Sequence, residues 1–347
     1  MQEISSLRRA PALTSLVAQV FGGAPGAAAA PGCPDDAGPL ARAVPQFEPR
    51  PGQRDMALAI AGIFEQGGRM LVEAGTGTGK TLAYLVPAIL SRQRVLVSTG
   101  TKNLEEQIYF KDLPALADAL GVRFTATYMK GRANYLCLRR LQTLRESCGA
   151  APSRGDPFLA LLLDWARETE TGDRAELGDL PEDLPLWNEV AATSDACLGS
   201  RCPHYNDCYV TRMRQRAAEA DIVIVNHHLL CADAALRQGE YGEVIPACAY
   251  AVLDEAHQLE DVATQYFGVA VSNHRVEDLC HDAEQVIGAH GLDREGFELG
   301  QSIEHLRDRA RTFFMGLQFG RMAGPPFEGS GEDRVRLNSE LLADNAD

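Results

Sequence analysis

Short runs of apolar residues recur along the chain from Phe47 onward, between stretches with helical periodicity. They lie at 70–73, 94–98, 124–129, 221–225 and 250–253. Runs rich in Val, Ile and Leu that lack polar alternation are typical of parallel strands buried on both faces, with helices as crossovers. The pattern therefore predicts an α/β domain with a parallel sheet.

Three regions depart from this rhythm. Residues 13–21 predict a short amphipathic helix, followed by an Ala, Gly and Pro linker that reaches residue 39. Residues 137–208 interrupt the sheet pattern and predict an insertion, since 155–190 carry ten acids against two arginines. The chain becomes helical and charged after Asp261, without a clear strand. The predicted domains are 1–39, 40–136, 137–208, 209–271 and 272–347.

Composition narrows the function classes. The chain has 347 residues, with 33 Lys and Arg against 48 Asp and Glu and a formal net charge of −15. Any binding of nucleic acid must therefore come from a local basic surface. A protein that only coats nucleic acid through its overall charge is excluded. Nine cysteines, an odd number, argue for thiols or metal ligands in a reducing compartment. No membrane span fits the interrupted N-terminal segment.

The strongest motif is a phosphate-binding loop that follows the run at 70–73. It reads EAGTGTGKT from Glu73 to Thr81 and leads into a helix start. Backbone N–H groups would surround a phosphate, Lys80 would contact the β- and γ-phosphates, and Thr81 would ligate Mg²⁺. Ala74 stands where the general pattern has its first glycine. The residues of the loop expected to hold nucleotide are Gly75, Thr76, Gly77, Thr78, Gly79, Lys80 and Thr81.

A second motif, Asp254-Glu255-Ala256-His257, ends the run at 250–253. Ligands bind at the carboxyl edge of parallel sheets, so these acids are expected beside the phosphate loop. Asp254 would hold Mg²⁺, and Glu255 would orient or deprotonate the attacking water.

With both motifs, the chain resembles the DinG/YoaA group of DEAH-type superfamily 2 DNA helicases, which are relatives of XPD. The resemblance extends to the stretch FEPRPGQ at 47–53, where it implies that Gln53 contacts adenine with support from Arg50. It implies that residues 98–107 touch DNA phosphates, and it includes the stretch NHHLL at 226–230. The implied catalytic residues are Lys80, Asp254, Glu255 and His257, on a RecA-like fold.

Four cysteines form a candidate metal centre: Cys137, Cys197, Cys202 and Cys208. Their spacing fits neither common zinc knuckles nor common ferredoxins, so zinc and free thiols remain open on spacing alone. The resemblance implies that they hold a 4Fe-4S cluster in an inserted domain. Basic residues near them would contact DNA phosphates: Lys130, Arg132, Arg139, Arg140, Arg201, Arg212, Arg214 and Arg216.

The resemblance also implies ATP-dependent 5′ to 3′ unwinding of single-stranded or forked DNA, in repair or replication, by a cytoplasmic monomer. It covers the first part of the family's length, ending in a partial helical arch domain. We therefore expect a fragment or truncated product that binds ATP and Mg²⁺ but does not unwind DNA alone. Two alternatives remain: a P-loop ATPase of another class with a zinc-binding insertion, and a non-enzymatic module that binds single-stranded DNA.

Overall fold

The computed structural model describes residues 11–22, 38–43, 48, 50–75, 77–147, 157–178, 184–194, 196–238, 243–268, 271–290 and 294–322. The chain divides into two compact units, Met1–Phe267 and Gly268–Asp347. The predicted linker before residue 39 lies mostly outside the described residues. The helix predicted at 13–21 is confirmed as α1 (Leu13–Phe21), followed by the short α2 (Pro39–Ala43).

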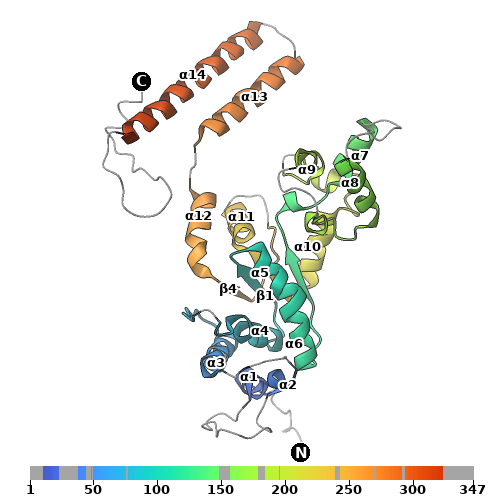
Figure 1. The fold of residues 1–347 in the computed structure, drawn as a ribbon, viewed down its shortest axis with the longest axis vertical. Helices are drawn as coiled ribbons and strands as arrows, with labels where there is room; N and C mark the ends of the chain where they lie inside the picture. Colours follow the sequence, from blue (N-terminus) through green and yellow to red (C-terminus); the bar gives the residue numbers. More distant parts are fainter. Residues whose placement is uncertain are drawn as a thin grey trace, which may run out of the picture. The chain divides into compact units, whose positions relative to one another are not determined.

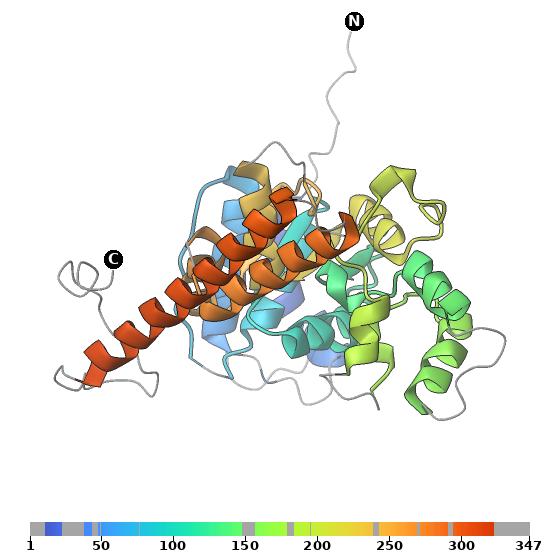
Figure 2. The ribbon, with the colours of Figure 1, turned by 90° about the horizontal axis from the view of Figure 1, so that it is seen from above.

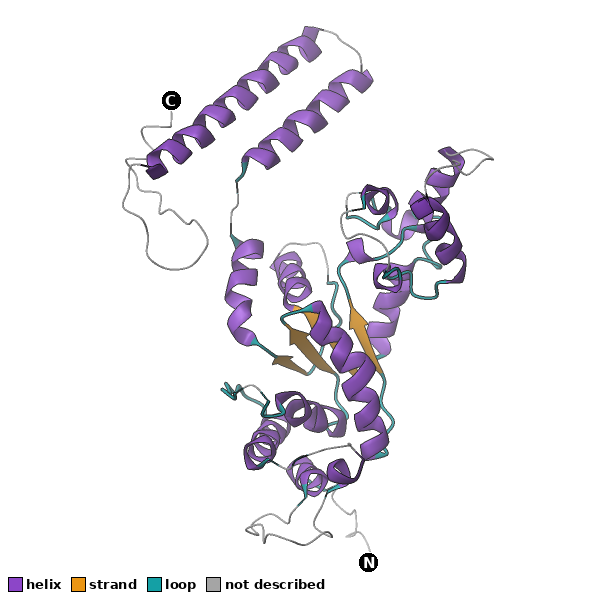
Figure 3. Cartoon of the chain, viewed as in Figure 1, coloured by secondary structure: helices purple, strands orange, loops and turns teal. Residues whose placement is uncertain are grey.

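The first unit contains a parallel sheet with the strand order β2-β3-β1-β4. Figure 3 shows the four strands. They are β1 (Val95–Thr99), β2 (Ala126–Met129), β3 (Ile222–Asn226) and β4 (Tyr250–Leu253). Four predicted strands are thereby confirmed. Because all of them run in the same direction, the residues that follow them gather at one edge of the sheet.

The strand predicted at 70–73 is wrong. Those residues form no strand, and the side chain of Leu71 is 94% exposed. Gly67 and Gly68, just upstream, have positive φ angles of 76° and 119°. Among the described residues the edge strand β4 pairs only with β1. Residues 70–73 do not pair with β4, so no described strand supplies hydrogen bonds to their backbone. An apolar run becomes a strand only where another strand satisfies its backbone groups.

The strands β1 and β3 are buried on both faces, as predicted, whereas Ala251 and Leu253 of β4 are exposed. Val95, Val97, Ile222 and Ile224 belong to a core formed with α1, α3 (Pro51–Gln66), α4 (Lys80–Leu90) and α6 (Leu113–Leu120). The alternate residues, including Leu96, Val223 and Val225, belong to a second core, which also includes residues of α10 (Tyr209–Glu219) and α11 (His227–Gln238). Helix α5 (Lys102–Gln107) continues through a π-helical turn, η2 (Ile108–Asp112), into α6.

The segment between β2 and β3 is largely helical and joins the second core. It contains α7 (Leu138–Ser147), α8 (Pro157–Glu168) and α9 (Pro185–Val190), with short 3-10 turns η3 (Arg132–Asn134), η4 (Arg174–Glu176) and η5 (Gly199–Arg201). Isolated bridges pair Tyr135 with Asp173 and Leu136 with Ala191. Buried Trp187 and Leu162 anchor it in the core. This segment therefore shares a core with one face of the sheet.

The first unit ends with η6 (Ala256–Gln258) and α12 (Leu259–Phe267). In the second unit, α13 (Asn273–His290) and α14 (Arg294–Met322) lie side by side (Figures 1 and 2). Arg307 joins them, since its guanidinium lies 2.9 Å from both Glu277 and Glu284. No helix in the described part of the chain is long and apolar enough to cross a bilayer.

Candidate functional site

The glycine-rich loop leads directly into α4. Gly77 and Gly79 have φ angles of 77° and 79°, a left-handed conformation that favours glycine. The Thr78 hydroxyl donates a hydrogen bond to the Gly75 carbonyl at 2.9 Å. Thr76 lies outside the described residues. Since α4 begins at Lys80, its free N–H groups and positive dipole end lie at the loop, an arrangement suited to an anion.

Gln53, from α3, packs against this loop. Its side-chain amide donates to the Gly79 carbonyl at 2.9 Å, while its Oε1 is buried without a partner. A Cβ at Gly79 would lie 2.1 Å from the Gln53 Nε2, so a larger residue there would displace this amide. An unpartnered buried acceptor suits a ligand that donates an N–H group, such as adenine. Arg50 instead forms an exposed pair with Glu48.

The acidic turn after β4 reaches the loop. The Lys80 Nζ lies 3.0 Å from the Glu255 Oε1, although the two residues are 175 positions apart. The exposed His257 lies beside the same carboxylate, with its Nδ1 3.5 Å from the Glu255 Oε2. Glu255 has a φ of 53°, which costs a non-glycine residue about 1–3 kcal/mol. The structure thus brings Lys80, Glu255 and His257 together.

Tyr84 completes this group, and sequence reasoning missed it. Its hydroxyl donates to the Asp254 Oδ2 at 3.0 Å and also interacts with the Thr81 hydroxyl. Burial, and then the Asp254 charge, raise the pKa of Tyr84 well above its usual value, so it stays a neutral donor. Its position four residues after Lys80, on the same helix face, was the available signal. Tyr84 therefore links the two side chains expected to hold Mg²⁺.

The end of β1 contacts the same acidic turn. The Asp254 N–H donates to the Ser98 carbonyl at 2.8 Å. The Ser98 hydroxyl lies 2.7 Å from the Nδ1 of His227, the first residue of α11, and both side chains are buried. Burial lowers the pKa of His227, so its imidazole is neutral. Thr101 caps α5 by accepting a hydrogen bond from the Leu104 N–H at 3.4 Å.

The four predicted cysteine ligands line one cavity of about 410 Å³. Cys137, Cys197, Cys202 and Cys208 are free thiols. Nowhere among the described residues do three or more His, Cys, Asp and Glu side chains lie placed to hold a single metal ion. Arginine, threonine and apolar side chains line the cavity as well, and four thiols are a donor set found both in zinc sites and in iron-sulfur clusters.

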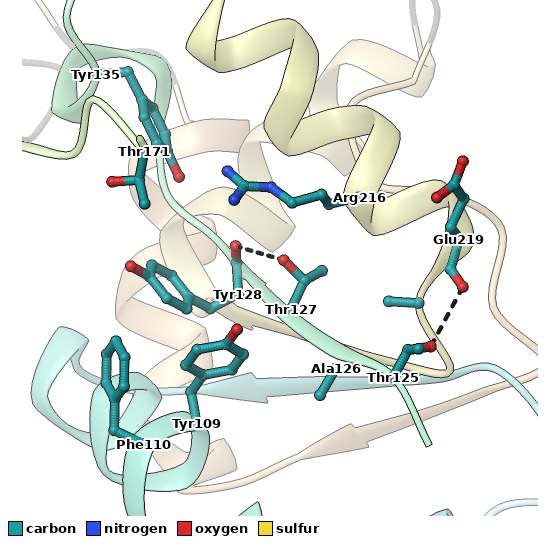
Figure 4. Close-up of a pocket in the computed structure, with 11 residues that line it drawn as sticks. Tyr109, Phe110, Thr125, Ala126, Thr127, Tyr128, Tyr135, Thr171, Arg216 and Glu219 are labelled. Atoms are coloured by element: carbon teal, nitrogen blue, oxygen red, sulfur yellow. Dashed lines mark hydrogen bonds between the residues drawn. The ribbon is translucent and has the colours of Figure 1, made fainter. Parts of the chain in front are cut away.

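The basic residues near these cysteines have different surroundings. Arg132, Arg139 and Arg214 line the cysteine cavity. Arg216 instead lines another cavity of about 350 Å³ beside β2, together with Tyr109, Phe110 and Tyr128 (Figure 4). Arg139 and Arg140 donate to backbone carbonyls, and Arg212 pairs with Asp207 at 2.7 Å. Four of the eight predicted phosphate-contacting residues therefore line one of these two cavities, and the other four line neither: Lys130, Arg140, Arg201 and Arg212.

Lys130 is not available to DNA, contrary to expectation. Its side chain is 3% exposed and lies 2.8 Å from Asp173 and 3.0 Å from Glu106. Burial lowers the pKa of Lys130, but its hydrogen bonds and charge interactions with Asp173 and Glu106 outweigh burial and raise it overall. Lys130 therefore joins α5 to the segment between β2 and β3.

Glu105 is fully buried beside this ion pair, and neither of its carboxyl oxygens has a hydrogen-bond partner. Burial raises the pKa of Glu105 from 4.5 to about 8, against the attraction of Lys130. The folded protein therefore keeps a proton that the unfolded chain releases, so this residue lowers stability as the pH rises from about 4.5 to 8.

We expect Glu105→Gln to remove this decrease in stability. A pKa shift of one unit corresponds to about 1.4 kcal/mol. The free energy of unfolding of the variant should therefore exceed that of the parent by roughly 3 kcal/mol at pH 7 and should be similar to it at pH 4. Urea unfolding across this pH range measures the difference. Asp118→Asn, at an exposed position on α6, is the matched control and should follow the parent. Parallel stability curves for the parent and Glu105→Gln would contradict the assignment of a raised pKa.

Comparisons with known proteins agree with this geometry. Residues 50–148 match the DEAD/DEAH box helicase family model. The chain is 44% identical over 245 residues to the ATP-dependent DNA helicase YoaA of Escherichia coli, covering 71% of this chain and 38% of that protein. It is 37% identical to YoaA of Haemophilus influenzae, covering 89% and 48%. It is 39% identical to the ATP-dependent helicase DinG of Mycobacterium tuberculosis, covering 62% and 35%. The chain spans less than half the length of these relatives.

Proposed function

Because the chain is a homologue of the YoaA and DinG ATP-dependent helicases and carries a DEAD/DEAH box helicase domain, we propose that it supplies the ATP-binding lobe of a DNA helicase. The observation that carries the proposal is the Lys80 to Glu255 contact of 3.0 Å, which joins the phosphate loop to the acidic turn. These are the two elements that phosphoryl transfer requires in proteins with a P-loop.

In the proposed site each side chain has one task. The loop glycines and the N-terminus of α4 bind the phosphates, and Lys80 neutralises the charge of the β- and γ-phosphates. Thr81 and Asp254 hold Mg²⁺, which neutralises charge on the transferring phosphate. A bound γ-phosphate competes with Glu255 for Lys80, which releases the carboxylate to orient or deprotonate the attacking water. Gln53 reads the adenine through its unpartnered Oε1.

The proposed DNA-binding surface begins at the end of β1. Within 98–107, the exposed residues Thr101, Lys102 and Asn103 touch the DNA phosphates, whereas Ser98, Thr99 and Glu105 are buried and do not. The complete enzyme moves 5′ to 3′ on single-stranded or forked DNA, in repair or replication. The described residues form one parallel sheet, whereas a helicase of this type hydrolyses ATP between two lobes. We therefore expect this chain by itself to bind ATP, to hydrolyse it slowly and not to unwind DNA.

The test is binding of a fluorescent ATP analogue and of an oligo(dT) strand by the 347-residue chain. The expected results are Mg²⁺-dependent nucleotide binding and DNA binding that weakens with salt. DNA binding without any nucleotide binding would favour the non-enzymatic module instead. Nucleotide binding without DNA binding would favour a P-loop ATPase of another class.

We further propose that Cys137, Cys197, Cys202 and Cys208 hold a 4Fe-4S cluster. Support comes from their common cavity, from their free thiols and from the volume of about 410 Å³. When bound, the cluster supplies cross-links that stabilise an acidic insertion with few apolar residues. The four cysteines lie near α7, the η5 turn and α10, so these elements meet at one cavity. The thiols also favour a reducing, cytoplasmic location.

The cluster proposal is tested by iron and sulfide analysis of anaerobically purified protein. We expect about four irons per chain with a visible absorbance band that bleaches on reduction. Cys197→Ser should lose most of the iron, because one ligand is missing. Cys248→Ser is the matched control, since Cys248 is a half-buried thiol that does not line the cavity. Colourless protein that contains zinc would overturn the proposal and favour the zinc alternative.

A further inference from the structure

His227 is a buried histidine between the expected DNA segment and the acidic turn. Its side chain is fully buried, and its Nδ1 lies 2.7 Å from the Ser98 hydroxyl. The ring also faces the backbone of Asp254 and Glu255. Its Nε2 is buried without a hydrogen bond of ordinary geometry. One imidazole therefore touches the end of β1 on one side and the Asp254-Glu255 backbone on the other.

The partner of each ring nitrogen follows from hydrogen-bond chemistry: the backbone carbonyls beside the ring are acceptors only. A neutral imidazole that carries its proton on Nε2 can donate toward them, which leaves Nδ1 to accept from the Ser98 O–H. Ser98 also receives the Asp254 N–H on its carbonyl at 2.8 Å. Ser98 is thus joined to the acidic turn both directly and through His227.

A further contact links the same two segments. A Cβ at Gly100 would lie 2.1 Å from the Gln258 Oε1, so the side chain of Gln258 rests on the backbone of the loop after β1. Glu255 keeps its left-handed φ of 53° within this group of contacts. An unfavourable backbone conformation persists only where the surroundings hold it in place. The Glu255 conformation therefore depends on the position of residues 98–100.

From these contacts we infer that His227 is a positioning residue that transmits the position of the Ser98–Thr101 segment to the Glu255 backbone, so that DNA and nucleotide binding are coupled. The inference rests on the proposed function, since it assigns DNA to one segment and nucleotide to the other. His227 touches neither ligand. It acts by fixing the position of the Glu255 turn relative to the end of β1, and so it maintains the contact between Lys80 and Glu255.

The test measures coupling rather than activity. The affinity of the 347-residue chain for a fluorescent Mg²⁺-ATP analogue is measured with and without saturating oligo(dT). We expect DNA to change nucleotide affinity about fivefold or more in the parent chain. His227→Phe keeps an aromatic ring without either nitrogen, and Ser98→Ala removes only the hydroxyl. Both variants should bind each ligand alone within about threefold of the parent, with coupling reduced below about twofold.

Controls separate the two proposals. His228→Ala is matched, because His228 is the exposed neighbour that contacts Tyr266, and its coupling should equal that of the parent. Circular dichroism checks that each variant is folded, and Ser98→Ala decides the outcome if His227→Phe is not. Two outcomes overturn the role of His227. One is coupling that persists in Ser98→Ala, and the other is a parent chain that binds both ligands without coupling between them. A parent that binds neither ligand instead refutes the proposed function.

Discussion

Replacing Lys130 by Met is expected to lower the free energy of unfolding of the first unit by about 3–5 kcal/mol, because it leaves a buried carboxylate without its cation. Asp173 is only 3% exposed and lies 2.8 Å from the Lys130 Nζ. The remaining partners of Asp173 are neutral: the Tyr128 hydroxyl at 3.3 Å and the Ala175 N–H at 3.0 Å. They cannot replace a full positive charge. Urea unfolding, followed by circular dichroism, measures the loss.

A double variant separates charge from packing. Adding Asp173→Asn to Lys130→Met removes the uncompensated charge, and we expect it to recover at least half of the loss, since removing both partners costs less than removing one. Lys111→Met is the matched control, because Lys111 is an exposed lysine on η2, and its change should stay within about 0.5 kcal/mol. A loss below about 1 kcal/mol for Lys130→Met would show that this ion pair does not join α5 to the insertion.

Replacing Lys80 by Ala is expected to weaken binding of a Mg²⁺-ATP analogue by about 100-fold, which corresponds to roughly 3 kcal/mol. The Nζ of Lys80 is the one ammonium group that the described residues place beside both the loop and the Glu255 carboxylate. Its removal deletes a charged hydrogen bond to the phosphates and leaves Glu255 to repel them. Fluorescence titration at constant Mg²⁺ measures the change.

Two further variants test whether the loss of affinity comes from the position of the Lys80 charge. Glu255→Gln should bind nucleotide at least as tightly as the parent, because Lys80 no longer has a competing carboxylate, while any residual hydrolysis falls. Lys111→Ala should bind as the parent does, since Lys111 lies on η2 and lines neither the loop nor the acidic turn. Unchanged affinity in Lys80→Ala would remove the phosphate loop from the proposed function.

The strands and the two motifs could be predicted because their signals are local. The buried strand β3 is apolar from Ile222 to Val225, and α4 begins where a glycine-rich loop meets Lys80. The sequence also predicts that Glu255 lies near Lys80, because parallel strands bring their carboxyl ends to one edge. That reasoning holds for the acidic turn, which follows β4, but residues 70–73 before the loop form no strand. The structure places those two side chains 3.0 Å apart.

The failures have a common origin. The run at 70–73 has the apolar character of a strand, yet pairing depends on a second segment that no local pattern specifies. The sequence predicts a surface cation at Lys130, but its partners Glu106 and Asp173 come from opposite sides of it in the sequence. Tyr84 and His227 looked like ordinary helix residues until β4 and β1 were placed against them.

The sequence alone therefore determined the α/β class, four of the strands, the phosphate loop and the acidic turn, because each depends on neighbours within about ten residues. Only the tertiary structure decided which charges are buried, which strand edges are paired and which side chains support Asp254 and Glu255. The physical reason is that burial and pairing energies come from segments far apart in the sequence, by 24 positions for Lys130 and Glu106 and by 129 for Ser98 and His227.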